Sequence, residues 1–300
     1  MKKYGIILIL TTLILLAGCT TTSSTTQAYY KFTGDKAIEA TFVEYAPVSS
    51  ETDTYQKGEE IAIAVELSNM LTEAIPESLV KVRLTGDAAI DAFFTGAKEV
   101  SSPELDARDI TTGDPDTEEI EPGPIVYVGE VTTKVSKEIT GQYCYEYPVK
   151  VKANLFYTNK EEEIGNNLPQ GSNPASSVQV TEITQGVVDV DDNVGELKFQ
   201  VTIENIGEGT VVSSLSDCFA FRDRQFREEL KLTAEGAYDI TCKDDGQIKL
   251  STADLSKTLD CTVTGIDATN LGDQASELTL TLSGFAYEEE LEPVMIWLEP

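Results

Sequence analysis

The chain has 300 residues, with 52 acidic side chains, 22 Lys and Arg, no His and a formal net charge of −30. Without His it has no Ser-His-Asp triad, no Cys-His dyad and no imidazole metal ligand, and its negative charge argues against binding to nucleic acid. With 41% hydrophobic residues the chain can bury a folded core, and its length predicts about two domains.

Residues 1–18 have the composition of a secretory signal peptide. Lys2 and Lys3 precede an apolar run to Gly18 that is shorter than the roughly 20 residues of a membrane-spanning helix. The run ends in Leu16-Ala17-Gly18-Cys19, which resembles the lipobox of prokaryotic lipoproteins. The resemblance implies cleavage before Cys19 and a lipid on its thiol. A plain signal peptide or an uncleaved anchor is the alternative.

A mature chain that begins at Cys19 has 282 residues (300 minus 18) and a side-chain charge of −32 (20 minus 52). Two acyl chains on this cysteine would suffice to anchor the protein to a membrane. Residues 19–32 follow as a tether, because the stretch TTTSSTTQ at 20–27 has no apolar side chain to bury. We therefore expect an extracytoplasmic protein, lipid-anchored at the cell surface.

Residues 33–158 form the first predicted β-rich unit. Apolar side chains alternate with polar ones at 61–67, 80–84 and 143–157, a period typical of strands with one buried face. Further strands are expected at 37–45, 90–95 and 125–135, whereas the acidic segment 113–124 is predicted to be a loop. Short strands separated by Gly, Pro and Asp turns indicate an antiparallel Ig-like β-sandwich.

Residues 159–176 are polar and rich in Gly and Pro, and are predicted to be an interdomain linker. The unit that follows, 177–300, repeats the alternation at 197–204, 278–283 and 294–298. Only 222–235 has a spacing that favours a short helix or an irregular excursion. The sequence therefore predicts an all-β protein with two antiparallel Ig-like sandwiches.

The segment from Val201 to Val211 reads V-x-I-x-N-x-G-x-G-x-V. It resembles the strand-turn-strand signature of CARDB-like and S-layer-related Ig-like domains in archaeal and bacterial surface proteins. We expect Asn205, Gly207 and Gly209 to adopt unusual backbone angles in the turn. Leu67-Ser68-Asn69 holds a comparable place in the first unit without the glycines, so family membership of that unit stays open. The resemblance implies a spacer, an adhesin or an envelope component.

Four cysteines besides Cys19 are compatible with a disulfide framework in an exported protein. Cys242 and Cys261 each lie an even number of positions from neighbouring apolar residues, and such residues share one face of a strand. Both cysteines are therefore expected to point into the second sandwich and to form a disulfide. Two buried free thiols are the alternative. Cys144 and Cys218 lie in different predicted units. A bond between them would join the two domains, and their pairing stays open.

Asp189, Asp191 and Asn193 match the first three ligand positions of a calcium loop. Gly195 comes one residue late, however, and Gln200 replaces the bidentate Glu. A weak Ca²⁺ site and a solvated hairpin turn are therefore both open, and the pattern favours the turn. The carboxylates of residues 114–121 are interpreted as a solvated charge run. No other cofactor is expected.

The sequence has no nucleophile elbow, phosphate-binding glycine loop or dinucleotide fingerprint. We expect a non-enzymatic, membrane-anchored lipoprotein that displays binding or spacer domains for adhesion or envelope structure. Its expected partners are the membrane, through the lipid, and an envelope protein or polysaccharide, but no nucleic acid. One alternative is a self-assembling surface-layer or filament subunit that pairs through residues 293–298. Another is a carbohydrate-binding module or a carbohydrate-active enzyme.

Overall fold

The segments in which apolar and polar side chains alternate form antiparallel β-strands in the described part of the chain. The computed structural model describes residues 31–86, 93–220, 228–250, 254–272 and 275–300. Within these ranges it contains twenty β-strands and four short 3-10 helices. The signal peptide, Cys19 and nearly all of the tether lie outside the described residues. The fold is all-β, as the sequence predicts.

The strands of the N-terminal half are β1 (Ile38–Phe42), β2 (Glu60–Ile61), β3 (Val65–Asn69), β4 (Val80–Gly86), β5 (Phe94–Gly96), β6 (Glu99–Ser101), β7 (Asp116–Ile120), β8 (Ile125–Tyr127), β9 (Val135–Tyr145) and β10 (Val149–Phe156). Those of the C-terminal half are β11 (Val178–Gln185), β12 (Asp189–Asp191), β13 (Val194–Asn205), β14 (Thr210–Val212), β15 (Glu228–Glu235), β16 (Asp239–Cys242), β17 (Gln247–Leu250), β18 (Ser256–Asp267), β19 (Ala275–Ser283) and β20 (Ala286–Leu298). The 3-10 helices are η1 (Glu161–Glu163), η2 (Leu215–Asp217), η3 (Lys243–Gly246) and η4 (Ala268–Asn270).

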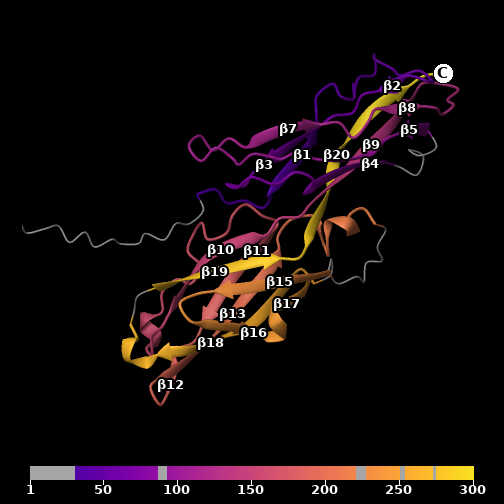
Figure 1. The fold of residues 1–300 in the computed structure, drawn as a ribbon. Helices are drawn as coiled ribbons and strands as arrows, with labels where there is room; N and C mark the ends of the chain where they lie inside the picture. Colours follow the sequence, from indigo (N-terminus) through magenta and orange to yellow (C-terminus); the bar gives the residue numbers. More distant parts are fainter. Residues whose placement is uncertain (1–30, 87–92, 221–227, 251–253, 273–274) are drawn as a thin grey trace, which may run out of the picture.

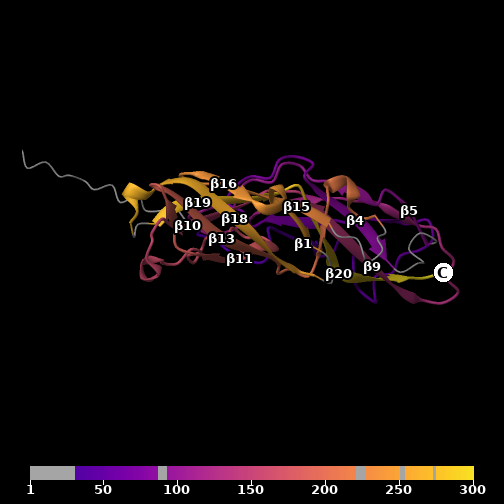
Figure 2. The same cartoon turned by 90° about the horizontal axis from the view of Figure 1, so that it is seen from below.

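The strands form five sheets that gather into two lobes (Figure 1). The first lobe contains the sheets β1-β3-β7, β2-β8-β5 and β14-β20-β9-β4-β6. The second lobe contains β10-β19-β15-β17 and β11-β13-β18-β16, with β12 added to β13. The molecule is elongated (Figure 2), with the β12–β13 hairpin near one end and the C terminus at the other (Figure 1).

One continuous cluster of buried apolar side chains runs through both lobes, from Ile38 on β1 to Leu282 on β19. A second cluster fills the far end of the first lobe, where Tyr127 of the small sheet packs with Ile139 and Ile296 of the long sheet. Because the main cluster crosses from lobe to lobe, the two lobes share a hydrophobic core.

The strand pairing crosses the domain boundary that the sequence predicts at 159–176. β10 precedes this segment but pairs with β19 in the second lobe, and β20 ends the chain but pairs with β9 in the first. The segment itself lies along the edge of β10, where Lys152 N donates to Ser172 O at 3.0 Å and Asn154 N donates to Asn167 O at 2.8 Å. It therefore protects a strand edge.

Two predictions of local structure are wrong. Residues 228–235 of the expected helical segment form β15, because Leu230 and Leu232 both face the shared core. The acidic residues 116–120, expected in a loop, form β7, which pairs with β3. In that strand Ile120 is buried while the three preceding residues are exposed. One apolar side chain and backbone pairing thus outweigh a polar composition.

Candidate functional site

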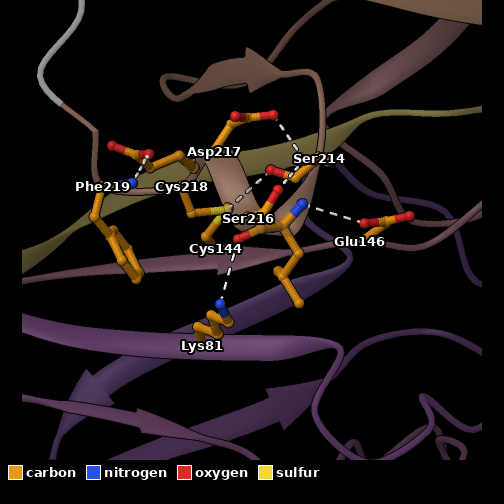
Figure 3. Close-up of a disulfide and its surroundings, with 10 residues drawn as sticks. Lys81, Cys144, Glu146, Ser214, Ser216, Asp217, Cys218 and Phe219 are labelled. Carbon is orange, nitrogen blue, oxygen red and sulfur yellow. Dashed lines mark hydrogen bonds between the residues drawn. A yellow bond between two sulfur atoms is a disulfide. The ribbon is translucent and has the colours of Figure 1, made fainter.

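A disulfide between Cys144 and Cys218 fixes the segment after β14 to the outer face of β9 (Figure 3). The two Cα atoms are 6.2 Å apart. Cys144 is fully buried and packs with Val212 and Ala286 in a small cluster of its own. Because β14 has joined the sheet of β9, this bond lies within the first lobe. The pairing that the sequence left open is therefore present, and it does not join the two lobes.

Charged side chains of the long sheet hold the backbone around this disulfide. Leu215 N donates to Glu146 at 3.2 Å, and Phe219 N donates to Glu288 at 2.7 Å. Lys81 Nζ donates to Leu215 O at 3.5 Å from the strand beneath the loop (Figure 3). These bonds and the disulfide together give the loop one fixed position on the sheet.

The second disulfide joins Cys242 on β16 to Cys261 on β18, as the sequence predicts. The two residues are direct partners in the antiparallel register, with Cα atoms 4.0 Å apart. Cys261 is buried and Cys242 packs against the shared core. The four cysteines of the described chain are thus all paired.

The asparagine of the V-x-I-x-N segment has a counterpart in the first lobe. At the end of β13, Asn205 Oδ1 accepts from Gly207 N at 3.2 Å and Nδ2 donates to Gly209 O at 2.9 Å. At the end of β3, Asn69 Oδ1 accepts from Leu71 N at 2.9 Å and Nδ2 donates to the carbonyl of residue 73 at 3.0 Å. Both asparagines are buried. The two lobes therefore use the same turn after corresponding strands.

The reason predicted for the two glycines of this segment is wrong. None of Asn205, Gly207 and Gly209 has a positive φ. Instead, a Cβ at Gly207 would lie 2.3 Å from the Tyr287 hydroxyl, and a Cβ at Gly209 would lie 2.3 Å from the carbonyl oxygen of Glu288. The glycines are needed because β20 passes close to the turn.

Polar groups meet where the lobes join. Lys36 Nζ lies 2.7 Å from a carboxylate oxygen of Glu289, whose side chain is 8% exposed. The hydrogen bond to Glu289 raises the pKa of Lys36 above its usual value. The residues just before Lys36 are also fixed, because Ser176 N donates to Gly34 O at 3.1 Å and Ser177 Oγ donates to the carbonyl of residue 35 at 2.7 Å. The beginning of the described chain is thus fastened to the junction.

Tyr143, Tyr145 and Tyr287 line the same junction, and the first two lie on the buried face of the alternating segment 143–157. Burial raises the pKa of Tyr143 and Tyr145 far above the usual range, and raises the pKa of Tyr287 to about 12. Tyr287 Oη accepts a hydrogen bond from Gly209 N at 2.7 Å and donates to Asn205 Oδ1 at 3.3 Å. The phenols therefore remain protonated at neutral pH, and that of Tyr287 ties β20 to the Asn205 turn.

The residues of the candidate calcium loop form a two-residue hairpin. Asp189 and Asp191 lie on β12 and pair with β13, and the turn residues Asp192 and Asn193 have φ values of 46° and 69°. All four are exposed. Across the described ranges, no three His, Cys, Asp or Glu side chains are grouped so that they could hold a metal ion. The geometry is that of the solvated turn that the sequence favours.

The largest hollow among those described has a volume of about 450 Å³ and lies at the outer face of β13 and β18. Its polar lining includes Lys198, Gln200 and Asp260, and Gln200 Nε2 donates to Asp260 Oδ1 at 2.7 Å. These groups can form hydrogen bonds with a hydroxylated ligand.

No family model and no curated protein match the chain. Among solved structures, the secreted serine protease VesC from Vibrio cholerae is 10% identical, with a TM-score of 0.18 over 78% of this chain and 48% of the protease. The B domain of a biofilm-associated protein is 10% identical, with a TM-score of 0.17 over 86% of this chain and 74% of that one. The chain thus spans about half the length of the protease. Similarity at this level supports no functional argument.

The fold and its bonds define a disulfide-bonded, antiparallel β-sandwich protein. Disulfides persist in oxidising compartments and are rare in the cytosol, which indicates an extracytoplasmic location. None of the helices in the described ranges is long and apolar enough to cross a membrane.

Proposed function

We propose that this protein is an extracytoplasmic lipoprotein, anchored by a lipid on Cys19, that displays β-sandwich lobes at the cell surface for adhesion or envelope structure. One observation carries the proposal. Of the five cysteines in the chain, four are paired in two disulfides, and the fifth is the cysteine of Leu16-Ala17-Gly18-Cys19. A cysteine that follows a signal-like segment and has no structural partner among the others is suited to lipidation.

The proposed role is non-enzymatic display, with an envelope protein or polysaccharide as the partner. The shared turn of Asn69 and Asn205 supports the view that both lobes are Ig-like domains of the CARDB-like or S-layer-related kind. The net charge of −30 keeps such a surface soluble and disfavours acidic partners.

Self-assembly by strand addition to the end of the chain is less well supported. Residues 294–298 already pair with β9 on one side, and Leu298 is bridged by Tyr55 on the other. Pro293, which has no N–H to donate, and a register shift between Leu291 and Val294 interrupt the remaining edge. Both features are typical of edges that resist pairing with other chains.

A carbohydrate-binding module is the second candidate, because the hollow beside Gln200 and Asp260 has hydrogen-bonding groups and a volume suited to a small sugar. Dialysis of the soluble domain against neutral oligosaccharides tests this candidate. Retention that is lost in the Gln200→Ala and Asp260→Ala variants would support it.

Mass spectrometry of the mature N terminus in a prokaryotic host tests the main proposal. We expect the chain to begin at Cys19 with a diacylglyceryl thioether, and the Cys19→Ser variant to leave the membrane fraction or to stay unprocessed. An intact Met1 or an unmodified Cys19 contradicts the proposal. Size measurement of the soluble domain then separates display from assembly, because display predicts a monomer and assembly predicts ordered polymers.

A further inference from the structure

The first described residues form a compact cationic and aromatic cluster with a distant loop. Lys31 Nζ donates to the carbonyl of Ile110 at 2.8 Å and lies 4.9 Å from the centroid of the Phe32 ring. The Arg108 guanidinium lies 4.6 Å from the same centroid, and Arg108 Nε donates to the carbonyl of Gly113. We call Lys31, Phe32, Arg108 and Ile110 the exit patch, because the chain leaves the described structure there.

The loop that carries Ile110 presents an apolar side chain to solvent on a folded base. Ile110 is 63% exposed, the most exposed aliphatic side chain among the large hydrophobic residues described. The Asp109 carboxylate accepts the backbone N–H groups of Thr111 at 2.6 Å and Thr112 at 3.2 Å, which fixes the loop. These two bonds also lower the pKa of Asp109. The loop therefore presents Ile110 to solvent from a hydrogen-bonded turn.

The position of the exit patch along the chain limits what it can meet. Lys31 is 12 residues from Cys19, and 12 fully extended residues span at most about 40 Å. A lipid on Cys19 would therefore keep the exit patch within that distance of a bilayer. The patch also brings two cations together in a chain of net charge −30, although Asp109 and Asp114 flank it.

We propose that the exit patch is the surface through which the protein contacts the membrane. Ile110 enters the headgroup region, and Lys31 and Arg108 bind lipid phosphates. This inference rests on the lipid anchor proposed for Cys19. A tethered contact needs little intrinsic affinity, because a short linker gives an effective concentration in the millimolar range. Lys31 and Phe32 of the exit patch are close in sequence to residues 35 and 36, which are held at the junction of the two lobes.

Depth-dependent quenching of tryptophan fluorescence tests this contact. The chain from residue 19 has Cys19 as its single cysteine outside the disulfides, so it can be coupled to a maleimide lipid in vesicles of phosphatidylcholine and phosphatidylglycerol. In a Trp297→Phe background, Ile110→Trp is compared with Val194→Trp, a matched site at the distant hairpin that is 56% exposed. Brominated acyl chains then quench only indoles that enter the bilayer.

We expect the tryptophan at 110 to be quenched and blue-shifted, and the tryptophan at 194 to keep its emission. Adding Lys31→Ala or Arg108→Ala should lower the population in contact by about fivefold for each cation removed. Equal quenching at both sites, or none at 110, overturns the proposal. Because the lipid is attached chemically, this result does not depend on whether cells lipidate Cys19, and mass spectrometry of the native protein decides that question separately.

Discussion

Asn69 and Asn205 hold the same turn in the two lobes. Each amide accepts the N–H two residues ahead and donates to the carbonyl four residues ahead. Each also ends the strand that lies second in its sheet, β3 beside β1 and β13 beside β11. The glycines found only in the second lobe do not create this turn, and they are explained by the passage of β20.

Replacing either asparagine by Ala should lower the free energy of unfolding by about 2–3 kcal/mol, because each buried amide makes at least two hydrogen bonds to the backbone that the variant loses. Asn159 is exposed, and Asn159→Ala should stay within about 0.5 kcal/mol of the parent. Urea unfolding of the three variants measures this. Equal stability of Asn205→Ala and Asn159→Ala would contradict a structural role for the turn.

Gly209→Ala should destabilise the protein by about 1–3 kcal/mol, since its Cβ would lie 2.3 Å from the backbone oxygen of Glu288. Gly272→Ala is the matched control, because no atom lies within 4 Å of its added Cβ and its φ is not positive. Thermal unfolding of both variants gives the comparison. A similar melting temperature for the two would mean that β20 does not pass the turn this closely.

The two disulfides should differ in what their removal costs. The chain-entropy model gives about 3 kcal/mol for Cys242–Cys261, at a separation of 19, and about 4.5 kcal/mol for Cys144–Cys218, at a separation of 74. Double Ala variants of each pair, compared by urea unfolding, test the order. Peptide mapping without reduction should recover these two pairs, and any crossed pair contradicts the arrangement of β9, β16 and β18.

Stability should fall as the pH rises above about 10. The pKa of Tyr287 is about 12 in the folded protein and near 10 in the unfolded chain, so between these values the folded state holds a proton that the unfolded state has lost. Each such tyrosine removes about 1.4 kcal/mol per pH unit in this window. Tyr143 and Tyr145 shift in the same direction. The raised pKa of Lys36 acts in the same direction: its contribution to stability is fully present below pH 10.5 and is lost as the pH rises above that value.

Urea unfolding of the Cys19→Ser variant from pH 8 to pH 11 measures this loss without a thiol that could exchange with the disulfides. Tyr287→Phe should have a shallower decline. A stability that stays constant across the range would mean that these phenols are accessible to water in the folded state.

Lys36 and Glu289 should be coupled in a double-mutant cycle. Lys36→Met leaves a carboxylate that is 8% exposed without its cation, and should cost about 1–3 kcal/mol once the partial exposure of Lys36 is considered. Glu289→Gln in the same chain should cost less than it does alone. Additive effects, measured by urea unfolding, would exclude a functional ion pair at the junction.

Alternating side chains were enough to predict an all-β protein, because one face of each strand must be buried. The same parity placed Cys242 and Cys261 inside the second sandwich and Tyr143 and Tyr145 in the core. The N-terminal signal also rests on a local pattern, the residues just before Cys19, and it stays a prediction because that segment lies outside the described residues. These features were readable because each depends on residues near one another in the chain.

Pairing between distant strands was decided only by the tertiary structure. β10 pairs with a strand of the second lobe and β20 with a strand of the first. The alternation of side chains along a strand does not specify these pairings, because they join segments far apart in sequence. The same pairings bring Cys144 and Cys218 into one lobe and place Tyr287 against Gly209. The strand at 116–120 and the close approach at the glycines also depend on neighbours supplied by remote segments. Local patterns thus determined which residues are buried. Long-range packing determined which other residues each buried side chain contacts.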